Sequence, residues 1–114
     1  MTEPLCLESL DDDALDRLPF GVVLLSPAGL VERINRVEVE RAGIQRWRAI
    51  GRDYFRELAG PTLAAHVDAV EPGKRTRVFH TFHGFHRVDD AVIDVSRCPE
   101  GRVTLCIRPT SRPM

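Results

Sequence analysis

The sequence has few cysteines and no long apolar run. Its 114 residues include only three cysteines, Cys6, Cys98 and Cys106, without Cys-x-x-Cys spacing, which argues against a disulfide framework and a structural zinc site. No stretch reaches the roughly 18 apolar residues that a membrane-spanning helix needs, and the acidic N-terminus is unlike a secretory signal. We therefore expect a cytoplasmic protein that does not bind membranes.

An excess of charge of either sign is also missing. Sixteen Lys and Arg residues stand against seventeen Asp and Glu residues, so the formal net charge of -1 gives no global attraction to nucleic acid. The sequence contains no nucleophile elbow, no glycine-rich phosphate loop and no convincing pair of carboxylates, so we do not expect an enzyme. Its 43% hydrophobic and 29% charged residues are typical of one folded domain.

The first two thirds of the chain predict a hairpin and several short helices. A helix over Ser9–Leu18 has Ser9 as its cap and ends at Pro19. Two apolar runs around the turn residues 26–29 predict a β-hairpin. Helical spacing and breaker residues then predict four short helical pieces, which are a helix capped by Asn35 and ending near Gly43, two pieces within 46–59 joined at Gly51, and a helix bearing Leu63, Val67 and Val70.

The last third changes to the composition of strands. Residues 76–86, 91–98 and 103–107 are rich in β-branched and aromatic side chains, which predicts a three-stranded antiparallel meander. The fold class is therefore α+β, a five-stranded antiparallel sheet with short helices on one face and an additional N-terminal helix. We divide the chain into an N-terminal helical cap (1–18), the main domain (19–109) and a short tail (110–114).

Two motifs make this pattern similar to a known family. The order of elements is that of PAS domains, and the stretch Leu15–Leu25 with Asn35 and Glu38 resembles the N-terminal half of the photoactive yellow proteins. The segment Ile50–Ala59 (IGRDYFRELA) resembles that family's IGKNFFKDVA, and His80-Thr81-Phe82 resembles its Tyr-Thr-Phe on the central strand. The resemblance covers roughly residues 10 to 109 and implies a PAS fold.

The chromophore-binding positions of the resembled family are only partly kept in this sequence. That family attaches p-coumarate to a cysteine as a thioester, and a glutamic acid and a tyrosine hydrogen-bond the phenolate. Here the cysteine position falls on Pro61, the tyrosine position on Ile34, and the glutamic acid position remains Glu38. Because proline has no nucleophile, we expect no covalent p-coumarate.

Alternation along residues 78–86 assigns further residues to a ligand pocket. Successive strand side chains point to opposite faces, so His80 and His86 point one way and His83 the other, which disfavours a three-histidine metal site. His80 shares the face of Phe82, which matches a pocket-lining phenylalanine of the resembled family. We predict a pocket formed by Ile34, Glu38, Pro61, His80 and Phe82. His80, or His66 on the last helix, is a candidate haem ligand, and another small aromatic ligand is the alternative.

The opposite face of that strand predicts an interface. It carries Phe79, Thr81, His83 and Phe85, which is too apolar for an exposed sheet surface, so the N-terminal helix or a second subunit should cover it. A hairpin turn centred on Val88-Asp89 would place His83 opposite Asp94.

These patterns together predict a stand-alone sensory or regulatory domain. It would bind a small molecule noncovalently, a signalling protein, or both, and would form a homodimer. Three alternatives remain open, which are a haem-based gas or redox sensor, a small acid–base enzyme using His80 with Glu38, and a pure dimerisation module.

Overall fold

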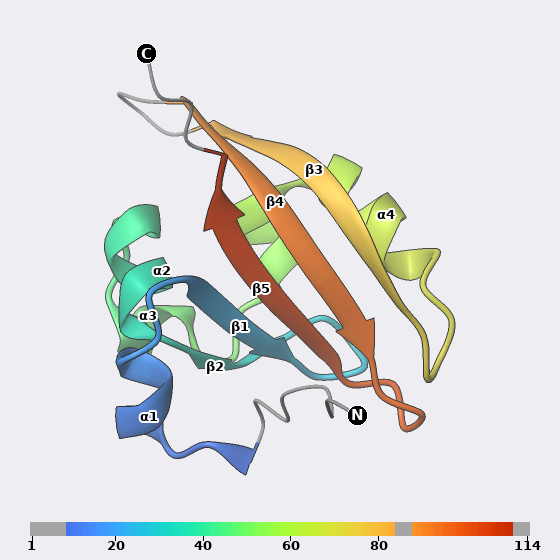
Figure 1. Ribbon diagram of the computed structural model, residues 1–114, viewed down its shortest axis with the longest axis horizontal. Helices are drawn as coiled ribbons and strands as arrows, with labels where there is room; N and C mark the ends of the chain where they lie inside the picture. The colour runs from blue at the N-terminus through green and yellow to red at the C-terminus, as the bar shows by residue number, and fades with distance from the viewer. Residues whose placement is uncertain (1–8, 84–87, 111–114) are drawn as a thin grey trace.

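The protein is built on one antiparallel sheet of five strands in the order β2-β1-β5-β4-β3 (Figure 1). The computed structural model describes residues 9–83 and 88–110. Along the chain the elements are α1 (Asp12–Asp16), β1 (Gly21–Leu25), β2 (Val31–Ile34), α2 (Arg36–Ala42), α3 (Arg46–Ala49), η2 (Phe55–Ala59), α4 (Pro61–Asp68), β3 (Arg75–His83), β4 (Val88–Arg97) and β5 (Val103–Pro109). This architecture confirms the α+β prediction. None of the described helices is both long enough and apolar enough to cross a membrane.

Strand β1 lies between β2 and β5 in the sheet and is buried on both faces. It pairs with β2 on one side, with Val23 opposite Ile34, and with β5 on the other, with Val23 opposite Leu105. All five of its residues are buried. A continuous apolar run such as Phe20–Leu25 is what a strand covered on both faces requires.

Helix α2 begins and ends at the residues that the sequence predicts. Asn35 is its N-cap, and Gly43 ends it in the left-handed conformation (φ 69°), which glycine adopts without the steric penalty of a side chain.

The Asn35 side chain also joins three elements. Its Oδ1 accepts from the N–H groups of Val22 (2.9 Å) and Glu38 (3.2 Å), and its Nδ2 donates to the carbonyls of Leu15 (2.8 Å) and Phe20 (3.0 Å). Because the residue is 1% exposed, its whole hydrogen-bonding capacity is used inside the protein. Asn35 thereby fixes α2 relative to β1 and to the end of α1.

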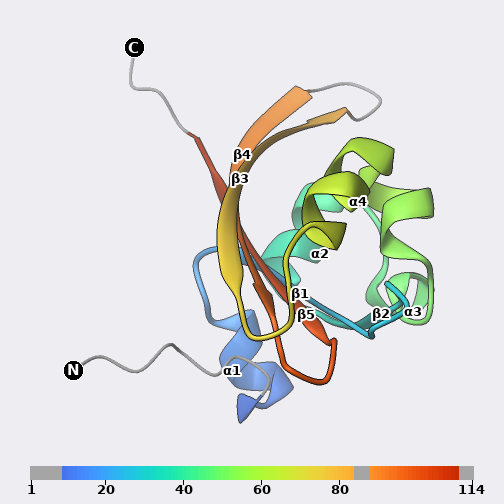
Figure 2. The same cartoon turned by 90° about the vertical axis from the view of Figure 1, so that its right-hand side faces the viewer.

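The main core lies between the sheet and the helices α2, α3, η2 and α4, which Figure 2 shows on one side of the sheet. Alternate strand residues point into it, among them Val23, Leu25, Val78, Ile93 and Leu105. Helix α4 contributes Leu63 and Val67, both at most 1% exposed. The apolar residues that the sequence places on one side of this helix therefore form the face that packs on the sheet.

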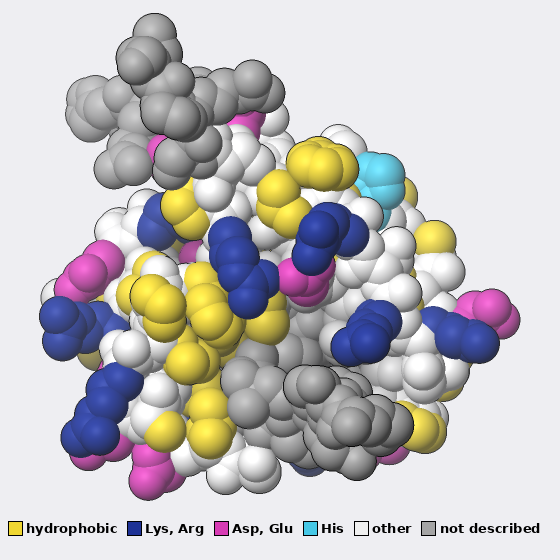
Figure 3. Space-filling model, in the orientation of Figure 1, with side chains coloured by type: hydrophobic (Ala, Val, Ile, Leu, Met, Phe, Trp, Pro, Cys, Tyr) yellow, Lys and Arg dark blue, Asp and Glu magenta, His cyan; other side chains and the backbone are white. Residues whose placement is uncertain are grey.

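Helix α1 covers part of the other face of the sheet. Leu15 packs there against Val22 and Leu24, with Leu10, Leu18, Phe20 and Cys106 around them, and hydrophobic side chains gather over this region in Figure 3. The helix cap is Asp11, whose Oδ1 accepts from Ala14 N–H (2.8 Å), so the assignment of the cap to Ser9 is wrong. The predicted helix is real but starts later.

The β3–β4 hairpin has a different register from the predicted one. Asp94 lies opposite Arg77, and the Arg77 Nε donates to the Asp94 Oδ1 (2.9 Å). His83 lies opposite Val88. The prediction failed because Val88-Asp89-Asp90 was interpreted as a turn. These residues are part of β4, where the Asp90 carboxylate accepts a cross-strand hydrogen bond from Thr81 Oγ1 (2.7 Å).

Candidate ligand site around Glu38 and Arg41

Glu38 is a carboxylate that α2 holds inside the protein. It is 1% exposed, and its N–H donates to the cap residue Asn35, so the start of the helix determines where this side chain enters the core. Strand β1 approaches it at Gly21, where an added Cβ would overlap Glu38 Oε1 and lie 3.2 Å from Glu38 Cβ. The close approach of β1 and α2 at this point therefore favours glycine at position 21, because a larger residue would displace the Glu38 carboxylate.

Arg41, one helical turn later, is the partner of this carboxylate. Its Nε donates to Oε1 (3.0 Å) and its Nη2 donates to Oε2, which is the bidentate arrangement that a planar guanidinium favours. Burial raises the pKa of Glu38, the hydrogen bond and charge of Arg41 lower it, the charge of Asp89 raises it, and the balance is a raised pKa. Burial would lower the pKa of Arg41, but the Glu38 hydrogen bond and charge outweigh this effect and raise it. The pair thus combines a permanent cation with a carboxyl group that accepts a proton unusually readily.

The guanidinium of Arg41 also stacks on β3. Its central carbon lies 3.9 Å from the centroid of the Phe82 ring, which is 7% exposed. The Phe82 ring in turn packs edge-to-face with His80, with centroids 4.6 Å apart. Cation–π and edge-to-face contacts therefore connect Glu38 on α2 to His80 on β3.

Tyr54 adds a hydroxyl group to this region. The residue is 1% exposed, and its hydroxyl has no hydrogen-bond partner among the described residues. Burial raises its pKa, the charge of Glu38 raises it further and the charge of Arg41 lowers it, so the hydroxyl is within electrostatic reach of the ion pair. A neutral, buried donor thus lies close to the Glu38–Arg41 pair.

The five residues of the predicted pocket do not all lie together. Glu38, His80 and Phe82 are connected through Arg41, as described above. Ile34 is a buried member of the main core, 4% exposed. Pro61 is exposed at the start of α4 and lines a separate cleft.

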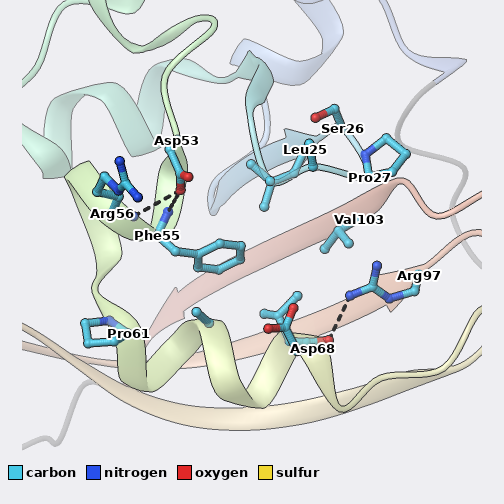
Figure 4. Close-up of a pocket in the computed structure, with 14 residues that line it drawn as sticks. Leu25, Ser26, Pro27, Asp53, Phe55, Arg56, Pro61, Asp68, Arg97 and Val103 are labelled. Carbon is cyan, nitrogen blue, oxygen red and sulfur yellow. Dashed lines mark hydrogen bonds between the residues drawn. The ribbon is translucent and has the colours of Figure 1, made fainter.

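That separate cleft has a volume of about 520 Å³ and lies between the β1–β2 turn, η2, α4, the end of β4 and the start of β5 (Figure 4). The Phe55 ring points into it. Arg97 on its wall donates to the carbonyls of Val67 (2.9 Å), Val70 (2.7 Å) and Gly101 (3.2 Å). Because its guanidinium is committed to three backbone carbonyls, Arg97 ties α4 to the sheet.

The predicted interface and haem residues have the following positions. Phe79 is 74% exposed, Thr81 is half-buried, and Phe85 and the side chain of His83 lie outside what the structure describes. Helix α1 packs over β1 and β5, so it does not cover Phe79 as one of the two alternatives expected. His66 is exposed on α4 and lines a groove beside β3.

Sequence reasoning missed Arg41 and Tyr54. Arg41 follows Glu38 by three residues, which is a spacing that brings two side chains together on a helix. Tyr54 is the only tyrosine of the chain and stands where the resembled family has phenylalanine. Both signals were present, but neither indicates that the side chain points inward.

Comparison with known proteins agrees with this architecture. No family model matches the chain. The photoactive yellow protein of Rhodobacter capsulatus is 43% identical over 44 residues, a stretch that spans 39% of this chain and only 36% of that protein. The photoactive yellow protein domain of the sensor histidine kinase Ppr from Rhodospirillum centenum matches 89% of this chain and 95% of that domain, with a TM-score of 0.70 and 20% identity. The chain has the PAS fold, and its structure is similar to that of a photoactive yellow protein domain.

A PAS domain with a bound small molecule is also similar. The PAS domain of the Cronobacter turicensis quorum-sensing receptor RpfR, in complex with BDSF, matches 83% of this chain and 97% of that domain, with a TM-score of 0.66 and 15% identity. At such identity the likeness concerns the fold.

The residues of this chain do not fit two familiar cofactors. A thioester-linked p-coumarate needs a thiol, and no residue from Ala59 to Ala65 carries one. A haem between α4 and β3 would have to displace Val67, Val70 and Val78, which pack together in the core and are each at most 7% exposed. Haem ligation by His66 or His80 therefore remains a prediction without support from the packing.

Proposed function

We propose that this PAS domain is a sensory or regulatory module that binds a small organic anion noncovalently beside Arg41. The observation that carries the proposal is the Tyr54 hydroxyl, buried without a hydrogen-bond partner among the described residues. Buried polar groups in proteins are nearly always hydrogen-bonded, so this hydroxyl needs a partner that the described residues do not supply, which is an ordered water or a bound ligand.

The chemistry of the neighbouring groups favours an anion with a planar body. Arg41 is a permanent cation, Tyr54 is a neutral donor, and Glu38 becomes a third donor when it is protonated. Three donors suit a carboxylate or phenolate oxygen, and the aromatic face of Phe82 suits an apolar or aromatic body. The RpfR PAS domain in complex with BDSF, which has a similar fold, supports a small-molecule role.

Binding would couple to a proton. A ligand carboxylate that replaces Glu38 as the partner of Arg41 leaves Glu38 buried without its cation. Since the pKa of Glu38 is already raised, Glu38 then takes up a proton from solvent and remains neutral. This exchange changes the contact of α2 with β3, and through that contact the sheet, which would be the output of the sensory domain.

A protein partner or a second copy is the other candidate, and it is favoured by Phe79, an aromatic side chain 74% exposed on the outer face of the sheet. The homodimer predicted from this face stays a prediction. Sedimentation at micromolar concentration distinguishes a dimer from a monomer.

Native mass spectrometry with an absorption spectrum of the purified protein tests the proposal. We expect a small molecule that dissociates on denaturation and leaves a chain of unmodified mass, or an apo protein that takes up added cinnamate. A Soret band, or a bound group that survives denaturation, would contradict noncovalent binding of an organic anion.

A further inference from the structure

The two edges of the sheet are treated differently by the rest of the chain. At one edge, β2 is only four residues long, and residues 51–52 of the chain lie along its outer side. Val31 N–H donates to Arg52 O (2.9 Å), and Gly51 N–H donates to Val31 O (2.7 Å). At the other edge, β3 is nine residues long, and no strand of the described chain lies beyond it. The backbone on the outer side of β3 is therefore open to another strand.

Strand β3 also lacks the usual backbone features that prevent edge pairing. Its register with β4 runs without a shift from Arg75 opposite Ser96 to His83 opposite Val88, so no bulge bends it away. Its sequence contains no proline. Natural edge strands commonly carry one of these features when pairing must be avoided.

A groove of about 560 Å³ runs along this edge, with α4 behind β3 in Figure 1. The end of α4 and the turn after it form one wall, and the first half of β3 forms the other. Val70 and Val78 are buried at its base, and Phe79 lies on its rim with 74% of its surface exposed. The groove thus offers apolar contacts beside the open backbone.

Basic residues outnumber acidic residues in the groove. Lys74, Arg75 and Arg77 line it, against Glu71 as the only carboxylate among its lining residues. Lys74 and Arg75 are exposed, while Arg77 pairs with Asp94 on β4. With Arg77 paired, Lys74 and Arg75 stand against Glu71, so the lining residues of the groove carry one cation in excess.

We propose that the edge of β3 is a docking site for an extended acidic segment of a partner protein, which adds to the sheet as a sixth strand. Backbone hydrogen bonds supply the pairing, acidic side chains face Lys74 and Arg75, and an apolar residue contacts Phe79. This site is separate from the ligand site around Arg41, because it uses the outer edge of β3.

Charge favours such a partner over a second copy of this chain. In a symmetric antiparallel pair, the basic first half of β3 would lie against the second half of the other copy's β3. Residues 79–83 of that half contain no carboxylate, so Lys74 and Arg75 would gain no acidic partner from the second copy. An acidic strand compensates them.

The test uses the full chain and a fluorescent probe, the peptide fluorescein-Val-Phe-Thr-Glu-Val-Glu-Glu-amide, measured by anisotropy; paired antiparallel, its Phe lies opposite Phe79 and its last two Glu residues lie opposite Arg75 and Lys74. Two control peptides carry lysine in place of glutamate, or N-methyl groups that remove alternate backbone donors. We expect saturable binding of the acidic peptide, and affinity at least about tenfold lower for both controls. Amide hydrogen exchange should show new protection along β3 and no change along β2.

Variants identify the site. Lys74→Glu with Arg75→Glu should weaken binding of the acidic peptide by about tenfold or more and allow the lysine peptide to bind. A matched pair of exposed substitutions elsewhere, Arg48→Glu with Arg102→Glu, should leave the affinity within about twofold. Phe79→Ser should weaken binding by about tenfold while leaving the fold intact by circular dichroism.

Three results would overturn the proposal. One is the absence of binding by the acidic peptide at millimolar concentration. Another is equal binding by the N-methylated peptide, which would show charge attraction without strand addition. The third is self-association that protects β3 amides and excludes the peptide, which would assign the edge to a second copy.

Discussion

The guanidinium of Arg41 lies 3.9 Å above the Phe82 ring while it holds both carboxylate oxygens of Glu38. One side chain thus joins the buried carboxyl of α2 to the aromatic face of β3. This contact places a cation and an aromatic surface at the same point in the interior, which is where the proposed anion would bind.

Removing the cation should expose how much the pair stabilises the fold. Arg41→Met leaves the Glu38 carboxylate buried without its partner, so we expect a loss of about 3 kcal/mol at neutral pH. The double variant Arg41→Met with Glu38→Met should return to within about 1.5 kcal/mol of the wild type. Urea unfolding measures both. Arg36→Met, which breaks the exposed pair with Glu40, is the control and should cost less than about 0.5 kcal/mol. Additive single and double effects would contradict a coupled pair.

The stability contributed by Glu38 should fall as pH rises. Its pKa is raised in the folded protein, so above its ordinary value of 4.5 the folded state holds more protons than the unfolded chain. The contribution is therefore complete below that pH and is lost as pH rises through the folded pKa. Glu38→Gln does not titrate, so rising pH should shift the difference in unfolding free energy toward this variant. The limit is about 1.4 kcal/mol for each pH unit by which the pKa is raised.

Denaturant unfolding of wild type and Glu38→Gln between about pH 4 and pH 7 tests this sign. A difference that moves toward the wild type with rising pH would mean that Arg41 outweighs burial.

Asn35 should be among the most sensitive polar positions. Asn35→Ala removes four hydrogen bonds that join α1, β1 and α2, and we expect a loss of about 3 kcal/mol in unfolding free energy. Asn35→Asp keeps the acceptor but sets a carboxylate against the carbonyls of Leu15 and Phe20, so it should not restore stability. Ser26→Ala, which removes an exposed bond to Leu30, is the control and should change stability by less than about 1 kcal/mol. Wild-type stability of Asn35→Asp would refute the role of the side-chain amide.

Tyr54→Phe should separate stability from binding. Deleting a buried hydroxyl that has no partner among the described residues removes a desolvated group, so we expect a free protein that is as stable or up to about 1 kcal/mol more stable. The same change should weaken binding of an organic anion. Thermal unfolding without and with added cinnamate measures the two effects. A destabilisation above about 1 kcal/mol would mean that the hydroxyl has a partner within the protein.

The sequence predicted the features that local chemistry determines. Helix α2 begins after Asn35 and ends at Gly43, as predicted, because a helix start needs a side-chain cap and a left-handed helix end needs glycine, whatever the rest of the fold. Alternation placed Phe82 inside and Phe79 outside, because a strand leaves no other choice once one face is fixed.

Features that depend on tertiary contacts were not predictable in this way. The partner of Asp94 depends on where the hairpin turns. Asp89 and Asp90 have the composition of a turn, although they belong to β4 and Asp90 accepts a cross-strand hydrogen bond. The inward direction of Arg41 depends on Phe82, which lies 41 positions away along the chain and on a different element. Tyr54 carries no local sign that its hydroxyl is buried.

An NMR titration of the labelled protein tests the central claim most directly, with benzoate, cinnamate and p-coumarate as probes and benzamide as the matched neutral compound. The account predicts saturable shifts at Arg41, Tyr54 and Phe82 with at least one anion, affinity at least about tenfold lower for benzamide, and tighter binding at lower pH as Glu38 takes up a proton. Shifts confined to other residues, equal affinity for benzamide, or no saturable shift with any of the three anions would contradict it.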